Sequence, residues 1–300
     1  MTIFRGAFSN ALAPGFRKVV FETYKEKAIE GSRLVNMGTS RRAYEEDFNV
    51  AGFGTLPLKA EGGSTTYEDI VQGFIKRYIW TTYSLGFRIT QEMLEDDLYG
   101  IFGNKMSKAL GRSARNNFEV IAMSPFNSAF DTAVVGFNAS ESLVSTTHAL
   151  FGSGGSMANR PASDVDFSLV ALQAAIEHFH NLTDERGLPM LMTPKWLIHG
   201  VANHWTVSQI MKSQFLPGGS LNDINQVALE GLKPFLSHYL TDADSWFLLS
   251  DQTDINYFER VAPTFSNTDD FDTGDAKYKL RRRAGAGFGD WRGVYGSSGI

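Results

Sequence analysis

The sequence predicts an α+β fold in which single elements are as long as the whole molecule is wide. A β-leaning stretch over residues 66–89 alternates between two faces, and a helical pattern follows over residues 90–124. A compact globule of 300 residues is roughly 50 Å across. A helix of this length spans about 52 Å, and a strand of roughly 16 residues spans about 53 Å. We therefore expect elements that reach beyond the subunit's own core.

The first 40 residues predict an N-terminal arm with one helix. Short apolar pairs such as Val19-Val20 are mixed with charged residues, and no strong periodicity runs through the stretch. Residues 1–40 are accordingly assigned to the arm.

Residues 41–89 predict a long β-hairpin. Two β-leaning runs, 34–58 and 66–89, flank the turn-forming segment Lys59–Ser64. Apolar and polar side chains alternate in the second run, so its two faces differ.

The length of this hairpin suggests where it packs. Ordinary strands have about five or six residues, so we expect the hairpin to project from the body and to find its partner surface on a neighbouring subunit. The alternative is that bends at Gly73 and Gly86 divide it into shorter strands of one domain.

The longest helix is predicted over about residues 90–124. Thr90 is a candidate N-cap, Pro125 is expected to end the helix, and apolar residues recur at helical spacing between them. Acidic residues crowd the first half, and Lys and Arg follow, which complements the helix dipole.

The rest of the chain predicts shorter elements. A second helix is expected over 167–186, with Asp164 or Asp166 as its cap and Gly187 at its end. Further elements are a helix at 200–214, strands at 191–198, 232–239, 245–250 and 255–261, and a strand pair or hairpin at 276–295.

The charge of the chain changes sign near the C-terminus. Residues 241–275 carry nine acidic residues against the single Arg260, and residues 276–300 carry six Lys or Arg against the single Asp290. The net charge of the chain is −5, which argues against a dedicated nucleic-acid binder. Non-specific contact through a local basic patch stays open.

Composition also bounds the cellular context. The chain has no cysteine, so it has neither disulfides nor thiolate chemistry, as expected of assembly in a reducing cytoplasm. No stretch approaches the roughly 20 apolar residues that span a bilayer, and the start of the chain lacks the apolar core of a signal peptide. We expect a protein that is neither secreted nor inserted in a membrane.

No catalytic or metal-binding pattern stands out. His178 and His180 lie two apart on a predicted helix and therefore face different directions. His199 and His204 lack the His-Glu-x-x-His arrangement of a helical metal site. Nucleophile elbows and phosphate loops are absent from the sequence. We predict no enzyme, no cofactor and no metal.

Two further patterns have structural explanations. Gly285, Gly287 and Gly289 superficially suggest a dinucleotide loop, but they follow three arginines in a predicted strand and no helix begins after them, so we expect close strand packing. The acidic run Asp269–Asp275 does not match an EF-hand, and we expect it to form a solvated or intersubunit surface.

Several motifs together resemble the major head proteins of Mu-like tailed phages and prophages, which adopt the Hong Kong 97-type capsid fold. The resemblance covers nearly the whole chain, and the order of the predicted elements agrees with it. Its residues are Asp184–Pro189, Leu240–Asp242, Trp246–Asp251, Asp269–Gly274, Lys277–Lys279 and Gly289–Gly296.

The resemblance implies a structural protein of the virion capsid. Its parts would be the N-terminal arm (1–40), the extended loop (41–89), a peripheral domain with the spine helix (90–188), an axial domain (189–275) and strands returning to the peripheral domain (276–300). Subunits would form pentamers and hexamers, and these an icosahedral head around double-stranded DNA, assembled in the host cytoplasm. Expected partners are other copies of the chain, a scaffolding protein and a portal, with a decoration protein as an optional one.

Candidate contact residues follow from this assignment. Those for intersubunit contacts are Arg41, Arg42, Lys59, Lys76, Arg77, Trp80, Asp290, Trp291 and Arg292. Those for contact with DNA phosphates are Arg112, Arg115, Arg281, Arg282 and Arg283. The rival hypothesis is that these arginines pair with the 241–275 acids of a neighbouring subunit.

Two other classes of protein stay open. A cellular compartment of the encapsulin type shares the fold and would carry an internal site for a cargo peptide. A hydrolase or metalloenzyme is the third class, and stoichiometric metal retained by the protein would favour it.

Overall fold

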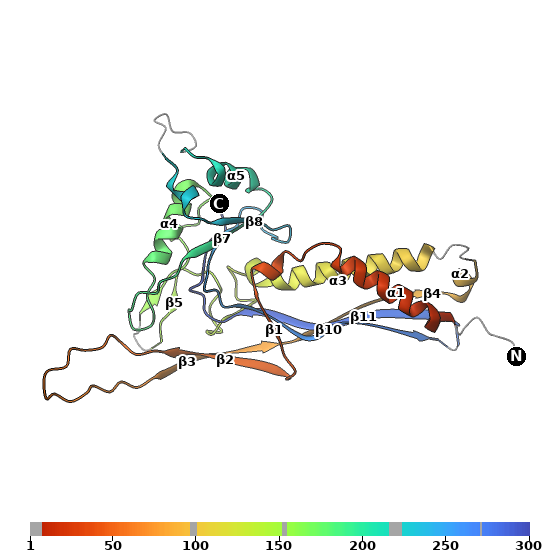
Figure 1. Cartoon of the computed structure of the whole chain (residues 1–300), viewed down its shortest axis with the longest axis horizontal. Helices are drawn as coiled ribbons and strands as arrows, with labels where there is room; N and C mark the ends of the chain where they lie inside the picture. The colour runs from red at the N-terminus through yellow and green to blue at the C-terminus, as the bar shows by residue number, and fades with distance from the viewer. Residues whose placement is uncertain (1–7, 97–100, 152–154, 216–223, 271) are drawn as a thin grey trace.

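The molecule is elongated, with a long two-layer unit, a smaller unit above it and a hairpin that projects from one end (Figure 1). The computed structural model describes residues 8–96, 101–151, 155–215, 224–270 and 272–300.

The long unit is built on a four-stranded sheet with the order β1-β10-β11-β4. Its strands are β1 (Asn36–Thr39), β10 (Ile255–Asp269), β11 (Ala276–Phe288) and β4 (Thr81–Ile89). β11 pairs antiparallel with both β10 and β4, whereas β1 runs parallel to β10. Helices α1 (Phe8–Lys25) and α3 (Ile101–Asn127) lie side by side on one face of this sheet (Figure 1).

Side chains of β11 alternate strictly between the two faces of the long sheet. Tyr278, Leu280 and Arg282 are buried beneath the helices, whereas Lys279 and Arg281 between them are exposed on the opposite face. This is the period of two expected of a sheet with one covered face. The alternation gives the long sheet an apolar inner face and a polar outer face.

The smaller unit contains the second four-stranded sheet, of order β12-β9-β7-β8. Its elements are β7 (Pro194–His199), β8 (Lys233–Leu236), β9 (Trp246–Ser250), β12 (Val294–Ser297), α4 (Leu169–His180), α5 (His204–Lys212) and the short helix η3 (Gln226–Leu229). All five residues of β9 are buried, because both faces of this central strand are covered.

The remaining elements are η2 (Gly31–Arg33), α2 (Gln91–Asp96), and the two-stranded pairs β2 (Tyr44–Ala51) with β3 (Val71–Ile79) and β5 (His148–Ala149) with β6 (Ser156–Met157).

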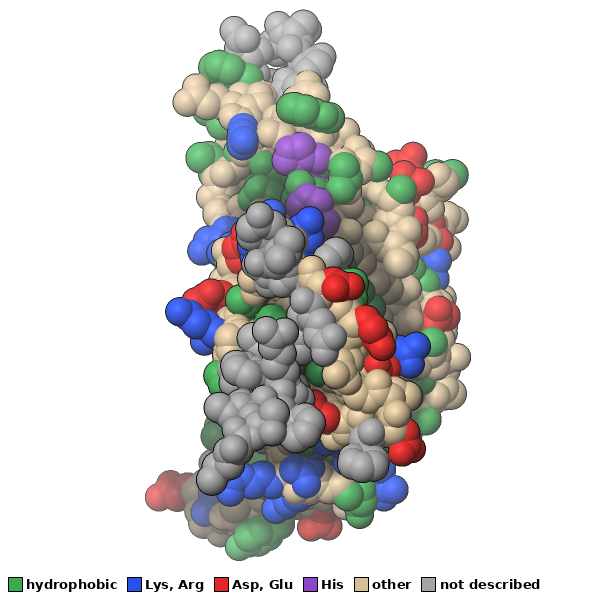
Figure 2. All heavy atoms as spheres, turned by 90° about the vertical axis from the view of Figure 1, so that its right-hand side faces the viewer, with side chains coloured by type: hydrophobic (Ala, Val, Ile, Leu, Met, Phe, Trp, Pro, Cys, Tyr) green, Lys and Arg blue, Asp and Glu red, His purple; other side chains and the backbone are tan. Residues whose placement is uncertain are grey.

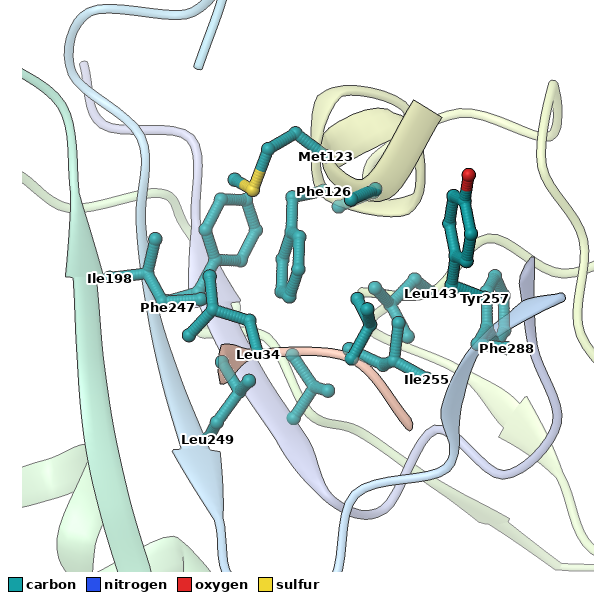
Figure 3. Packing of buried hydrophobic residues seen from close by; sticks show 14 of the residues in the cluster. Leu34, Met123, Phe126, Leu143, Ile198, Phe247, Leu249, Ile255, Tyr257 and Phe288 are labelled. Atoms are coloured by element: carbon teal, nitrogen blue, oxygen red, sulfur yellow. The ribbon is translucent and has the colours of Figure 1, made fainter. Parts of the chain in front are cut away.

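One hydrophobic cluster joins the two units. Met123 and Phe126, near the end of α3, pack against Phe247 and Leu249 of β9 and against residues of the long sheet such as Tyr257 (Figure 3). The rings of Phe126 and Phe247 are 5.5 Å apart. Burial of this apolar surface holds the two units together.

The predicted hairpin is shorter than expected, because its second strand changes sheets. β3 pairs with β2, but after Trp80 the chain continues as β4 and pairs with β11. The indole of Trp80 is buried, and its N–H donates a 3.1 Å hydrogen bond to the Arg42 carbonyl. The prediction of one continuous strand over 66–89 is therefore wrong. The alternative, division into shorter strands, is correct, although the break lies at Trp80 and not at Gly73 or Gly86.

The predicted long helix is confirmed for most of its length. Thr90 caps α2 as expected, since its Oγ1 accepts a hydrogen bond from the Met93 N–H at 3.3 Å, and residues 97–100 lie outside the described residues. Pro125, however, lies inside α3 and does not end it. Pro125 cannot donate to the Ile121 carbonyl, and the Ser124 hydroxyl donates to this carbonyl instead, at 2.8 Å.

Helix α4 begins and ends at other residues than predicted. Its N-cap is Ser168, which accepts from the Ala171 N–H at 3.2 Å, and its C-cap is Asn181. Asp164 pairs with Arg160 instead of capping the helix. The expected caps Asp164 and Asp166 and the expected end at Gly187 are therefore wrong.

The predicted hairpin within 276–295 does not form. β11 pairs with β10, and β12 joins the second sheet beside β9. β10 also extends eight residues beyond the strand expected to end at residue 261. The acidic and basic blocks of the C-terminal region thus include the two partners of one strand pair, which supports their pairing within the subunit.

Candidate functional site

The base of the hairpin lies against the outer face of the long sheet. The Tyr78 hydroxyl accepts a 3.1 Å hydrogen bond from the Asn256 amide, and the Tyr78 ring is 5.1 Å from that of Phe258. Two glycines of β11 allow this approach. A Cβ at Gly285 would lie 2.5 Å from the Ile79 carbonyl oxygen, and one at Gly287 would lie 3.1 Å from the Tyr78 ring. The prediction that these glycines serve close strand packing is confirmed.

Further contacts hold the hairpin at its midpoint. The ring of Phe74 lies 6.1 Å from that of Phe151, in an edge-to-face arrangement, and the Lys76 ammonium donates to the Val135 carbonyl. Arg186 reaches both strands near their outer ends, since its guanidinium donates to the Gly52 carbonyl at 3.2 Å and to the Asp69 carbonyl at 3.3 Å. The half of the hairpin nearer the body, formed by β2 and β3, is therefore fixed to the rest of the subunit.

A buried polar cluster supports these contacts from below. Arg292 donates to Glu185 at 2.6 Å and to Asp290 at 3.1 Å, with the side chains of Arg292 and Glu185 almost fully buried. The His148 ring stacks on Trp291 with centroids 4.1 Å apart. Burial raises the pKa of Glu185, although Arg292 opposes the shift, and burial lowers the pKa of His148. The cavity beside these residues measures about 20 Å³, which is the room of a single water, so the cluster is a support and not a substrate site.

The outer segment of the hairpin, residues 52–70, contacts little of its own subunit. It contains no strand, and nearly all of its residues are exposed. Leu56 and Leu58 are 93% and 102% exposed, and Tyr67 is 91% exposed. Apolar exposure on this scale in one segment marks an interaction surface.

Two basic side chains of the hairpin are already paired within the subunit. Arg77 forms a 2.6 Å ion pair with Glu46 and lies over the Tyr44 ring at 4.3 Å. Arg42 lies 3.7 Å from Glu45. Each ion pair also neutralises an acid, so the exposed charges outside these pairs are Asp47, Glu61, Glu68 and Asp69 against Arg41 and Lys59.

The candidate intersubunit residues divide into two groups. Arg41, Arg42, Lys59 and Arg77 are exposed on the hairpin. The others are buried or half-buried in their own subunit: Lys76, Trp80, Asp290, Trp291 and Arg292.

Three of these candidates need correction, because their side chains are committed within the fold. Trp80, Trp291 and Arg292 are each less than a tenth exposed. Trp80 fixes the change of sheets, and Arg292 belongs to the polar cluster. None of the three offers its side chain to a neighbour while the subunit is folded.

The candidate DNA-facing arginines do not share one surface, which corrects their grouping. Arg112 is exposed on the side of α3 that faces away from the sheet, and Arg115 donates to the Ala28 carbonyl at 3.4 Å. Arg281 is exposed and Arg283 half-buried, both on the opposite, outer face of the sheet. Arg282 is buried between these layers.

The contacts of Arg282 explain its burial. Its guanidinium donates to the Tyr257 hydroxyl at 2.6 Å and to Glu259 at 2.7 Å, and it lies over the Phe118 ring. These partners satisfy the two donors of one guanidinium nitrogen, and the ion pair with Glu259 offsets part of the cost of burying the charge. Arg282 therefore holds α3 against the sheet and faces no external ligand.

Within the described ranges, no group of three or more His, Asp or Glu side chains could hold a metal ion. No helix in this part of the chain is both long and apolar enough to cross a bilayer.

Fold and surface together define a shell subunit of the Hong Kong 97-type class. The chain is similar to a virus-like particle from Pyrococcus furiosus (9% identity, 95% of this chain and 98% of the other covered, TM-score 0.56). It is also similar to the procapsid of bacteriophage JBD30 (14% identity, 99% and 76% covered, TM-score 0.53) and to Microbacterium phage Oxtober96 (8% identity, 90% of each covered, TM-score 0.56). At these identities the likenesses show the fold.

The family follows from a match between the sequence and a family model. The chain belongs to the phage capsid protein family, whose model, described as "Phage capsid protein", matches residues 76–297. The search of curated proteins found no match to this sequence. The chain is a major capsid protein of a tailed phage, a structural subunit of the icosahedral virion head and not an enzyme, as the sequence predicted.

Proposed function

We propose that the hairpin is the extended loop by which each subunit packs on its neighbour in rings of five and six. The observation that supports this role is the contrast between its two halves. The base is fixed by Phe74, Lys76 and Tyr78, whereas the outer segment exposes large apolar side chains. A rigid base presents the outer segment in one orientation, which lowers the entropic cost of docking.

Deletion of residues 55–68 tests this role. The deletion leaves β2, β3 and all the anchoring contacts and shortens the connection between the strands to a length common in hairpins. We expect a subunit that folds with the wild-type melting temperature and forms no shells in electron micrographs. Full-size shells from this variant would overturn the proposal.

A point variant gives the same test without changing the length of the chain. Leu56→Ser/Leu58→Ser removes two of the most exposed apolar side chains of the outer segment. Val170→Ser/Leu191→Ser, at 73% and 88% exposure in the smaller unit, is the matched control. The hairpin variant is expected to reduce shell yield well below that of the control.

We further propose a correspondence between the parts of the subunit and those of its relatives. Residues 1–40 form the arm, and 41–89 form the extended loop together with β4. The long unit, with α3, β4, β10 and β11, corresponds to the peripheral domain, and the smaller unit, with α4, β7, β8, β9 and β12, corresponds to the axial domain. The expected ranges, 90–188 for the peripheral domain and 189–275 for the axial domain, therefore need correction, because α4 belongs to the smaller unit and β10 to the long one. The motifs Asp184–Pro189 and Gly289–Gly296 support a place in the Mu-like branch, which alignment with many Mu-like head proteins would test.

The helix side of the long unit is proposed to face the packaged double-stranded DNA. Lys105, Lys108 and Arg112 are exposed along one side of α3, at the spacing that aligns side chains on a helix. Such a row of cations neutralises phosphates without reading sequence. Reversing these three charges is expected to shorten the packaged genome while shells still form, and unchanged packaging would contradict the proposal. A scaffolding protein, a portal and an optional decoration protein complete the proposed assembly.

A further inference from the structure

His148 is fully buried, and each of its two ring nitrogens faces an oxygen atom. Nδ1 lies 3.1 Å from Oε2 of Glu141, and Nε2 lies 2.9 Å from Oδ1 of Asn159. A neutral imidazole has one N–H donor and one lone pair. If the ring and the two oxygens carried no additional proton, one nitrogen would face its oxygen lone pair to lone pair. The surroundings of the two oxygens therefore decide the protonation of the ring.

The side-chain amide of Asn159 is held in one orientation. Its nitrogen donates to the carbonyls of Leu143 at 2.8 Å and Val294 at 2.9 Å, and its oxygen accepts from the Ser145 N–H at 2.9 Å. A turned amide would set its oxygen against two carbonyl oxygens and its nitrogen against an N–H, so the hydrogen-bond network excludes it. An amide oxygen acts only as an acceptor. Nε2 of His148 is therefore the donor in the contact with Asn159.

The contact between Nδ1 and Glu141 then requires a second proton. Since Nε2 already carries one proton, a neutral ring would present the Nδ1 lone pair to the carboxylate. A proton between the two atoms gives either an imidazolium beside a carboxylate or a neutral ring beside a carboxylic acid, and both forms hold the same number of protons. The other carboxyl oxygen accepts from the Ala149 N–H at 2.9 Å and from the Asn138 amide at 2.8 Å, which favours the carboxylate and hence the imidazolium.

Charged groups of two other loops surround the pair. Asp290 and Arg292 follow β11, and Glu185 follows α4; all three line the small cavity beside the imidazole. Two carboxylates against one guanidinium favour a cation nearby. The imidazole also lies flat on the Trp291 indole, with centroids 4.1 Å apart and ring planes at 6°, and an aromatic face attracts a cation.

The balance between burial and these contacts depends on what loss of the proton would leave behind. Burial lowers the pKa of the His148 ring, whereas its contacts with Asn159 and Glu141 and the charge of Asp290 raise it. Without the proton, one of the two close contacts becomes repulsive, and no water reaches the buried ring to relieve it. The contacts therefore outweigh burial, and the pair keeps the proton.

The pair lies at the start of the segment that anchors the hairpin. His148 and Ala149 form β5, and Phe151, two residues further, packs on Phe74 of β3 with ring centroids 6.1 Å apart. Gly73 allows this packing, since a Cβ there would lie 2.7 Å from the Phe151 ring. The carboxylate of the pair also accepts the Ala149 N–H. A change in the position of β5 therefore reaches the hairpin through Phe151.

We propose that His148 and Glu141 share an additional proton at neutral pH and form an alkali-sensitive clasp on the anchor of the hairpin. With the proton bound, β5 and Phe151 hold the half of the hairpin nearer the body. At alkaline pH hydroxide takes up the proton, one ring nitrogen then repels its oxygen, and β5 and the hairpin loosen. The clasp works inside one subunit, so it is independent of the surface on which the hairpin packs in a shell.

The direction of the pH dependence follows from the two states of the chain. The folded subunit keeps a proton that an unfolded histidine releases near pH 6.5. The clasp contributes its stabilisation fully below this pH and loses it as the pH rises through the value at which the folded pair titrates. This direction is opposite to that of His178, whose pKa is lowered by burial alone. The two histidines therefore act in different pH ranges.

Nitrogen-15 NMR of the histidine rings in the unassembled full-length subunit tests the shared proton. At pH 7.5 an ordinary histidine is about nine-tenths neutral, whereas we expect both ring nitrogens of His148 to carry protons. Other histidine side chains lie at the surface of the molecule (Figure 2), so the His148 signals are assigned by their loss in His148→Gln. A neutral His148 ring beside an ionised Glu141, read from the carboxyl carbon-13 shift, would overturn the proposal. A neutral ring beside a protonated Glu141 still holds the shared proton and supports it.

Glu141→Gln separates the shared proton from the packing of the pair. The glutamine oxygen keeps the Ala149 and Asn138 donors, and its nitrogen donates to Nδ1 of a neutral ring, so no hydrogen bond is lost. We expect His148 to be neutral at pH 7.5 in this variant, with a melting temperature close to that of wild type. Glu177→Gln, at an exposed position of α4, is the matched control and is expected to leave His148 protonated. Equal protonation of His148 in both variants would sink the proposal.

Amide hydrogen exchange measures whether the clasp reaches the hairpin. After correction for the intrinsic effect of pH, protection of the β3 amides in wild type is expected to fall by about threefold or more between pH 7.5 and 9, while that of the β9 amides stays unchanged. In Glu141→Gln this fall is expected to be absent, because no shared proton is left to lose. Unchanged protection of β3 in the wild type would show that the pair does not act on the hairpin and would overturn the clasp.

Discussion

Gly285 and Ile79 meet backbone to backbone at the point where the hairpin crosses the long sheet. A Cβ on Gly285 would lie 2.5 Å from the Ile79 carbonyl oxygen, a separation that real Cβ atoms do not adopt. The position of the hairpin on the sheet therefore depends on the absence of a side chain at Gly285 as much as on the aromatic contacts of Tyr78 and Trp80.

Replacing Gly285 by alanine is expected to destabilise the subunit by about 1–3 kcal/mol, because the crowded backbone must move. Gly52→Ala is the control, since a Cβ there meets no atom within 4 Å, and its effect should stay within about 0.5 kcal/mol. Urea unfolding of the unassembled subunit measures both. Equal effects would show that the crossing is not tightly packed.

The stability of the subunit should depend on His178 in mild acid. Burial lowers the pKa of this imidazole to about 4, whereas an unfolded histidine titrates near 6.5. Between these values the unfolded chain binds the extra proton, so stability is full above about pH 6.5 and falls as the pH drops towards 4. At pH 4.5 the expected loss is on the order of 2 kcal/mol.

His178→Phe should weaken this pH dependence, because phenylalanine keeps the packing on the Tyr295 ring, whose centroid is 5.0 Å away, and does not titrate. Part of the dependence should remain, since burial also lowers the pKa of His199. His180→Phe, at an exposed position two residues on, should leave the dependence unchanged. Thermal melts from pH 4.5 to 7.5 compare the three proteins. A wild-type slope in His178→Phe would refute the assignment.

Glu119 fixes the link between the arm and α3. Its buried carboxylate accepts hydrogen bonds from the N–H groups of Glu30 at 2.7 Å and Gly31 at 2.8 Å. Glu119→Ala leaves both donors without this acceptor and is expected to cost about 3 kcal/mol.

Two variants sharpen the test of Glu119. Glu119→Gln keeps one acceptor oxygen and should lose less stability than Glu119→Ala. Glu177→Ala removes an exposed carboxylate from α4 and should change the free energy of unfolding by less than about 0.5 kcal/mol. The prediction fails if Glu119→Ala behaves like Glu177→Ala in chemical denaturation.

Arg186 should control the mobility of the hairpin without controlling the stability of the fold. Arg186→Ala removes the two hydrogen bonds to the Gly52 and Asp69 carbonyls. We expect faster amide exchange at Ala51 and Val71, which pair at the outer end of the two strands, with an unchanged melting temperature. Arg112→Ala, at an exposed site on α3, is the control. Unchanged exchange at both positions would show that Arg186 does not hold the hairpin.

Local sequence patterns were sufficient to predict much of the fold. The turn at Lys59–Ser64 forms as predicted, with Gly62 at a φ of +77° and the Gly63 N–H bonded to the Ala60 carbonyl. The apolar stripe of α3 and the cap at Thr90 are likewise confirmed. Each of these features is decided by residues within one or two turns of chain.

Other features depend on partners far along the chain, which no local pattern reveals. The alternation of residues 75–89 continues through Trp80, so nothing in it shows that β3 and β4 belong to different sheets. The two carbonyls bound by Arg186 likewise lie more than 100 residues away from it in sequence. One error was avoidable, because the period of a strand already separates Arg282 from Arg281 and Arg283.

Pairing of β1 with β10 also sets an order of events during synthesis. Residues 36–39 leave the ribosome early, but their parallel partners, residues 256–259, follow only after most of the chain has been made, roughly 10–40 s later at usual rates of translation. The long sheet is completed later still, when β11 ends at residue 288. The base of the hairpin docks on Asn256 and Gly285, so a nascent subunit carries its hairpin without these anchors until synthesis is nearly complete.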